Sequence, residues 1–146
     1  MFRGSSATKI DDKGRLKLPT GLRRQLESGY GPDVFITSVR GSSVHIYPVQ
    51  VWEEIEAALG ALPKTDQVKQ RFLERTSYYG QEATLDAQGR VVIPPILRTS
   101  AQMTGDVVVS ARLDHLEVWN HERLLERFEE QPFTDDDYGY LSERGI

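Results

Sequence analysis

Short stretches in which apolar and polar residues alternate recur along the whole chain and predict a fold built mainly from β-strands. Alternation with a period of two places apolar side chains on one face of a strand and polar side chains on the other. Most of the stretches end at glycine, proline or a polar turn, as short strands do. The expected strands cover residues 5–10, 15–18, 33–38, 43–47, 81–85, 90–93, 107–111 and 116–119.

Other segments repeat their apolar residues every three to four positions, which is typical of helices with one buried face. Val51, Ile55 and Leu59 form such a stripe. The same periodicity, weaker in the shortest segments, predicts helices at residues 22–28, 49–59, 66–79, 95–103 and 121–130. Strands and helices of this length together predict an α+β fold that is mainly β.

Two helix starts and one tail are predicted from local chemistry. Thr20 and Asn120 precede helical segments, and the side-chain oxygen of either residue can accept a backbone N–H bond as an N-cap. After Pro132, residues 133–146 are acidic and interrupted by glycine. We therefore expect a partly ordered tail there.

The first half of the chain is repeated in the second half. Residues 10–19, IDDKGRLKLP, align without gaps on residues 85–94, LDAQGRVVIP, at an offset of 75. Looser likeness continues beyond them, and Leu22-Arg23 matches Leu97-Arg98. Each copy is predicted to be a hairpin, a helix and a second hairpin. The expected organisation is a first repeat, a helical connector, a second repeat, and a C-terminal helix with its tail in one compact body: residues 5–52, 53–79, 80–124 and 125–146.

The repeated segment carries a turn followed by an arginine. Asp11 and Asp86 can accept bonds from nearby backbone N–H groups, while Gly14 and Gly89 supply positive φ, so turn chemistry explains these four residues. It explains Arg15 and Arg90 less well, because many residue types could begin the next strand. Each arginine could pair with its own turn carboxylate. Alternatively, its planar guanidinium could bind a phosphate or the O6 and N7 atoms of guanine.

Charge is distributed unevenly, which keeps nucleic acid open as a partner despite a net charge of −4. Residues 1–24 carry seven basic side chains against two acidic ones, for a local charge of +5. Residues 114–146 carry ten acidic side chains against three basic ones, for −7. A cation-dense region can bind a polyanion even when the whole molecule is acidic. The basic residues of this region that we predict to contact DNA are Arg3, Lys9, Lys13, Arg15 and Lys17.

Enzyme chemistry finds little support in the sequence. The 146 residues contain no cysteine, which excludes thiolate catalysis and cysteine-ligated metals. No phosphate-binding loop or nucleophile elbow is present. The three histidines, His45, His115 and His121, are scattered without metal-ligand spacing, so we assign them structural or surface roles. We predict no catalytic residue, metal, cofactor or small-molecule substrate.

The sequence shows neither a membrane-spanning segment nor a secretory signal, which favours a cytoplasmic location. No run approaches the roughly 20 apolar residues of a membrane span, and the first residues lack the apolar stretch of a secretory signal. We expect a cytoplasmic, nucleoid-associated protein with no membrane partner.

The paired turns at this separation, together with the initial MFRG, resemble the MraZ family, small bacterial regulators built from two SpoVT-AbrB-type units. The resemblance implies a pseudo-twofold barrel of swapped hairpins and closed homo-oligomeric rings. It also implies binding to short tandem G-rich repeats in the promoter of the cell-division and cell-wall gene cluster. DNA contact is implied for Arg15 and Arg90, with Lys13 included as a neighbour in the first turn.

The two repeats differ in charge, which suggests a division of labour on double-stranded DNA. Lys9, Lys13 and Lys17 are replaced in the second copy by Thr84, Gln88 and Val92. We therefore expect the three lysines to contact phosphates and the two arginines to read bases, with Gln88 able to contribute. A rival interpretation is an antitoxin-like interaction module of the same fold, which would use the acidic tail to bind a partner protein.

Overall fold

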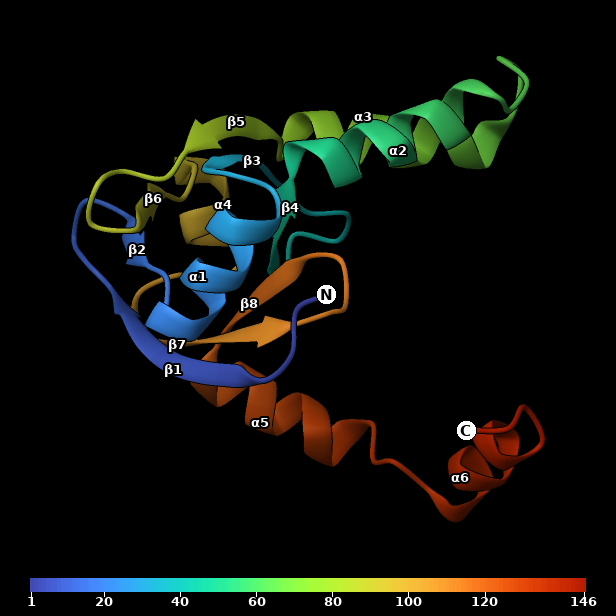
Figure 1. Ribbon diagram of the computed structural model, residues 1–146. Helices are drawn as coiled ribbons and strands as arrows, with labels where there is room; N and C mark the ends of the chain where they lie inside the picture. Colours follow the sequence, from blue (N-terminus) through green and yellow to red (C-terminus); the bar gives the residue numbers. More distant parts are fainter.

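Strands from both ends of the chain form one curved sheet (Figure 1). The computed structural model describes residues 1–146. Its strands run in the order β5-β3-β4-β8-β7-β1-β2-β6, with antiparallel pairing throughout. They are β1 (Ser5–Ile10), β2 (Arg15–Lys17), β3 (Asp33–Thr37), β4 (Val44–Pro48), β5 (Gln81–Thr84), β6 (Arg90–Val92), β7 (Gly105–Ala111) and β8 (Leu116–Asn120). The end strands β5 and β6 are joined by a short turn, so the sheet is a nearly closed barrel.

The two repeats interlock within this barrel. The strand β1 pairs with β7, β2 with β6, β3 with β5 and β4 with β8, so every strand of the first half hydrogen-bonds to a strand of the second half. The predicted fold class, a mainly β pseudo-twofold barrel of swapped hairpins, is confirmed.

A core of 20 buried residues fills the barrel. Each half contributes ten of them, and all but Phe2 and Met103 lie at equivalent positions of the two repeats. Leu16 and Val91 face each other across β2 and β6 and are 0% and 2% exposed. The neighbouring residues of these short strands point outward, as alternation requires. Burial of the apolar side chains therefore determines which side chains β2 and β6 present to solvent.

Six helices accompany the sheet: α1 (Thr20–Gly29), α2 (Val49–Gly60), α3 (Gln67–Tyr78), α4 (Pro95–Ser100), α5 (His121–Glu130) and α6 (Asp135–Ser142). Figure 1 shows α1 and α4 inside the curve of the sheet, whereas α2 and α3 run antiparallel and project away from the barrel. Leu22, Leu26 and Leu97 bind α1 and α4 to the core. None of the helices is long and apolar enough to cross a membrane.

Two local predictions are wrong. Thr20 does not cap α1: Pro19 occupies the N-cap position without a side-chain bond, and Thr20 is the first helical residue. The tail contains the helix α6, which begins with a capping box between Thr134 and Asp137. Its three leading aspartates also interact favourably with the positive end of the helix dipole. The predicted cap Asn120 is confirmed, since its side chain accepts a bond from the Arg123 N–H.

Candidate nucleic-acid interface

The first turn is held by the Asp11 carboxylate. Oδ1 of Asp11 accepts the backbone N–H groups of Lys13 and Arg15 at 3.0 and 2.9 Å, and Oδ2 accepts Nε of Arg15 at 2.6 Å. The Arg15 N–H is the main cause that lowers the pKa of Asp11 from its ordinary value. Asp11 is therefore an anion at neutral pH, and it fixes both the turn and the arginine that follows.

The second turn repeats this arrangement around Asp86. Its carboxylate accepts the backbone N–H groups of Gln88 and Arg90, both at 2.9 Å, and Nε of Arg90 at 2.9 Å. Here too the backbone N–H of the arginine is the main cause that lowers the pKa of the carboxyl. In both copies, therefore, the aspartate holds the turn and pairs with the arginine that follows it.

Pairing leaves the far end of each guanidinium free. Nε is the only guanidinium nitrogen of Arg15 and Arg90 with a protein partner, and the side chains are 36% and 31% exposed. Each arginine is therefore oriented by its aspartate while its terminal N–H groups have no protein partner. Such a planar fork can donate two parallel bonds to one acceptor pair.

Strand pairing brings the cations of both repeats onto one outward face. Lys17 lies directly opposite Arg90, and Arg15 lies opposite Val92. Arg15 and Arg90 are thus diagonal neighbours on the same face, and the Cα atoms of such diagonal positions are typically about 7–8 Å apart. Because Ile10 pairs with Leu16, continuing the register places Lys9 beside Lys17. We call these four residues, Lys9, Arg15, Lys17 and Arg90, the cationic strip.

Other predicted site residues lie at the margin of the strip or away from it. Lys13 and Gln88 are exposed at the tips of the two turns. Lys9 is 3.8 Å from Asp106 on β7, an exposed pair that contributes little. Arg3 precedes β1 at the end of the strand opposite to Lys9, and its backbone N–H donates to the side chain of Gln25. The structure therefore does not bring Arg3 to the strip.

Two arginines that sequence reasoning did not select brace the turns from the opposite repeat. Arg23 on α1 packs against Gly89 and donates through a terminal nitrogen to the carbonyl of Ala87 at 2.9 Å. Arg98 on α4 packs against Gly14 and donates Nε to the carbonyl of Ile93 at 3.0 Å. The repeat alignment already matched Arg23 with Arg98, which was the available signal. The contact of each arginine with the glycine of the other repeat follows from the interlocking of the repeats, whereas the hydrogen bond of Arg98 stays within its own repeat.

We expect Gly14→Ala to destabilise the fold and loosen the first turn. Gly14 has a φ of +76°, and an added Cβ would overlap the Arg98 side chain. Left-handed backbone costs a residue with Cβ about 1–2 kcal/mol, and displacement of Arg98 adds to that cost. Urea unfolding measures the loss. The matched control is Gly29→Ala, on α1 with ordinary φ and open space, which should be neutral or slightly stabilising. Equal stability of the two variants would contradict the bracing role of Arg98.

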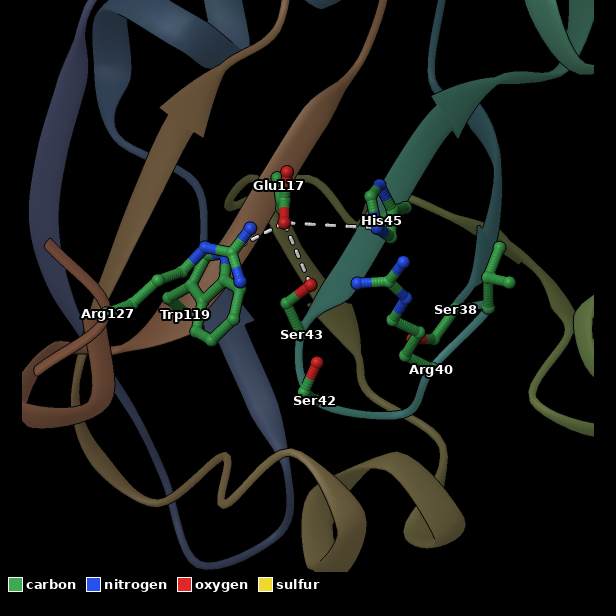
Figure 2. A pocket seen from close by; sticks show the side chains of 9 residues that line it. Ser38, Arg40, Ser42, Ser43, His45, Glu117, Trp119 and Arg127 are labelled. Atoms are coloured by element: carbon green, nitrogen blue, oxygen red, sulfur yellow. Dashed lines mark hydrogen bonds and ion pairs between the residues drawn. The ribbon is translucent and has the colours of Figure 1, made fainter. Parts of the chain in front are cut away.

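A second polar site lies on the outside of β4 and β8, around a pocket of about 200 Å³ (Figure 2). His45 and Glu117 are direct cross-strand partners, and Nδ1 of His45 is 3.2 Å from Nε2 of His115. The expectation that the histidines are scattered is therefore wrong for two of the three. They are 70 residues apart in sequence, so only strand pairing brings them together.

The whole chain is similar to known proteins. A family model described as "MraZ protein, putative antitoxin-like" matches residues 1–75 and 80–139. The chain is 48% identical to the transcriptional regulator MraZ of Acidobacterium capsulatum and 44% identical to that of Koribacter versatilis, over the full length of each protein. It is 32% identical to the transcriptional regulator MraZ of Shewanella oneidensis, over 89% of this chain and 86% of that one.

Proposed function

This chain belongs to the MraZ family of transcriptional regulators, and from that premise we propose that it binds DNA through the cationic strip as a homo-oligomeric ring. The observation that carries the proposal is the free guanidinium end of Arg15 and Arg90 on one exposed face, each held by its own aspartate. The proposed target is a set of short G-rich tandem repeats in the promoter of the cell-division and cell-wall gene cluster. Its proposed place is the cytoplasm, on the nucleoid.

The strip supports a division of labour among its side chains. Arg15 and Arg90 are pre-oriented and present planar forks, which suits bidentate bonds to guanine in the major groove. Lys9 and Lys17 are flexible point charges on the same face, and they are suited to phosphate contact. Lys13 and Gln88 at the turn tips could contact the flanking backbone or bases.

Two exposed apolar surfaces support assembly into a ring. The projecting α2–α3 hairpin carries an apolar groove of about 480 Å³, lined mainly by Ile55, Ala58, Leu59, Leu62, Val68 and Phe72. Leu125 and Phe128 lie three positions apart on α5, and Phe133 follows in the chain after the helix; each is more than half exposed, and we call these three residues the ridge. Exposed apolar patches of this kind mark interaction surfaces. The groove and the ridge lie on different parts of one molecule (Figure 1), as a head-to-tail contact requires.

Charge complements the groove and the ridge. Residues 64–75, which include most of α3, carry four basic side chains against two acidic ones. Residues 122–137, which include the ridge, carry seven acidic side chains against two basic ones. Opposite local charges favour insertion of the ridge of one copy into the groove of the next. Repetition of this contact around a rotation axis closes a ring.

We expect Lys17→Ala to weaken binding to every DNA sequence and to flatten its salt dependence. Each phosphate contact releases a counterion, so losing one contact per subunit lowers the slope of log K against log salt by about one per subunit engaged. Fluorescence anisotropy across a salt series, with DNA that carries the proposed target repeats and with scrambled DNA, measures both the affinity and its salt dependence. An unchanged slope would contradict phosphate contact by Lys17. Absence of any salt-dependent binding by the native protein would contradict the proposed function itself.

The antitoxin-like alternative is favoured by one observation on the C-terminal helix. Phe133, Tyr138 and Tyr140 are exposed around α6 beside Asp135, Asp136 and Asp137, a combination that suits a basic partner protein. Removal of residues 133–146 distinguishes the two functions, although Phe133 belongs to the proposed ridge, so assembly must be monitored in parallel. Loss of partner capture with retained DNA binding would favour the alternative.

A further inference from the structure

The side chains of His45, His115 and Glu117 converge where the two repeats meet. His45 belongs to β4 of the first repeat, whereas His115 and Glu117 belong to the β7–β8 turn and to β8 of the second. One ligand atom from each of the three lies within 4.8 Å of the other two. From this geometry we propose that the cluster is a divalent transition-metal site, of the kind that takes Zn²⁺, which links the repeats.

The distances between nitrogens suit such an ion. Two imidazole ligands at about 2.0–2.1 Å from a tetrahedral Zn²⁺ are roughly 3.3–3.4 Å apart. Nδ1 of His45 and Nε2 of His115 are 3.2 Å apart. Without a metal, this separation is bridged by a single proton, which the ion would replace.

A neighbouring carboxylate prepares His115 as a ligand. Oδ1 of Asp114 lies 2.8 Å from Nδ1 of His115, so the Nδ1–H donates to it and Nε2 keeps its lone pair toward His45. Carboxylates commonly hold metal-binding histidines in this way, fixing the tautomer and the ring orientation. Tyr47 restricts the His115 ring further, because the two rings stack with their centroids 4.3 Å apart and their planes 16° from parallel.

Glu117 supplies the third ligand and has one acceptor position left. Its Oε1 accepts bonds from Ser43 Oγ and Trp119 Nε1 at 2.9 and 2.7 Å, and it lies 3.9 Å from Nε2 of His45, beyond hydrogen-bond range (Figure 2). Oε2 is 3.1 Å from Nε of Arg112, and as a carboxylate oxygen it can accept a second contact. Two imidazoles with one carboxylate is a donor set that suits Zn²⁺ better than Mg²⁺ or Ca²⁺.

Nearby arginines set an upper bound on affinity. Arg112 pairs with Glu117, and Arg40 and Arg127 line the same pocket. Their charge opposes a dication, so we expect weaker binding than at the zinc site of a structural zinc finger. A substitution of Arg112 can therefore test whether Glu117 is a ligand. The Arg112 side chain is 47% exposed, and its removal frees Oε2 of Glu117.

Calorimetric titration of ZnCl₂ into the full, untagged protein tests the proposal. The native chain should bind one Zn²⁺ and show a higher Tm with the metal, whereas His115→Gln should lose this binding. The matched control His121→Gln, at the start of α5 and outside the cluster, should bind as the native chain does. Equal binding by the two variants, or no binding by the native chain, would overturn the site.

Two further variants keep the test independent of folding. Asp114→Asn changes an exposed residue that only positions His115, and it should weaken binding about 10- to 100-fold with an unchanged metal-free Tm. Arg112→Gln should strengthen binding several-fold, and an unchanged or weaker affinity would contradict Glu117 as a ligand. None of these measurements uses DNA, so their outcome is separate from that of the proposed function.

Discussion

Arg15→Ala is expected to abolish most of the discrimination between the target repeats and scrambled DNA while leaving the fold intact. A bidentate arginine–guanine pair is worth about 1–3 kcal/mol of discrimination, or roughly five- to 150-fold in affinity. The ion pair lost with Asp11 is exposed to solvent and contributes little to stability. Competition titrations with specific and scrambled DNA measure the discrimination directly.

Two matched variants separate base recognition from charge in this experiment. Arg15→Lys keeps the positive charge but loses the planar fork, so it should lose discrimination while it retains the salt slope. Arg144→Ala removes an arginine from the C-terminal end of the chain, which Figure 1 shows far from β2 and β6, and this variant should bind as the native protein does. Full discrimination by Arg15→Ala would show that Arg15 does not read bases. Arg90→Ala is expected to act in the same direction.

If the proposed ring forms through the ridge and the groove, Phe128→Asp and Leu59→Asp are each expected to leave the protein monomeric. Each places a carboxylate in one half of the proposed contact, in the ridge on α5 or in the groove on α2. Because the contact is head-to-tail, every copy needs both surfaces. An equimolar mixture of the two variants should therefore form a one-to-one pair, in which the remaining intact ridge occupies the remaining intact groove. Sedimentation velocity resolves the ring, the pair and the monomer.

Loss of the ring should weaken binding to DNA with several repeats much more than binding to one repeat. Linked sites gain about 10²- to 10⁴-fold in avidity, which a monomer cannot gain. Ile96→Asp changes an exposed apolar residue of α4 outside both surfaces and should leave assembly unchanged. A native ring in Phe128→Asp would contradict the proposed contact. Equal native affinity for one repeat and for several would contradict the role of the ring.

Local chemistry made much of the fold and part of the site predictable. The Asp11 turn closes within five residues, because its carboxylate, the N–H groups it binds and the positive-φ glycine all lie in that segment. The same local rule identified Asp86, and it identified Asn120 as a helix cap. The tail helix was missed because its acidic composition and Gly139 outweighed the capping pair, although Thr134 and Asp137 were visible three residues apart.

The sequence by itself determined the duplicated architecture, the alternation that turns Arg15, Lys17 and Arg90 outward, and the turns that orient both arginines. These features depend on bonds and periodicities that span only a few residues. The tertiary structure alone decided that Lys17 lies opposite Arg90, that Arg23 and Arg98 brace the turns of the opposite repeat, and that His45 meets His115. Each of these contacts joins residues more than 60 positions apart, and their partners follow from how the two repeats interlock, which periodicity within one strand does not encode.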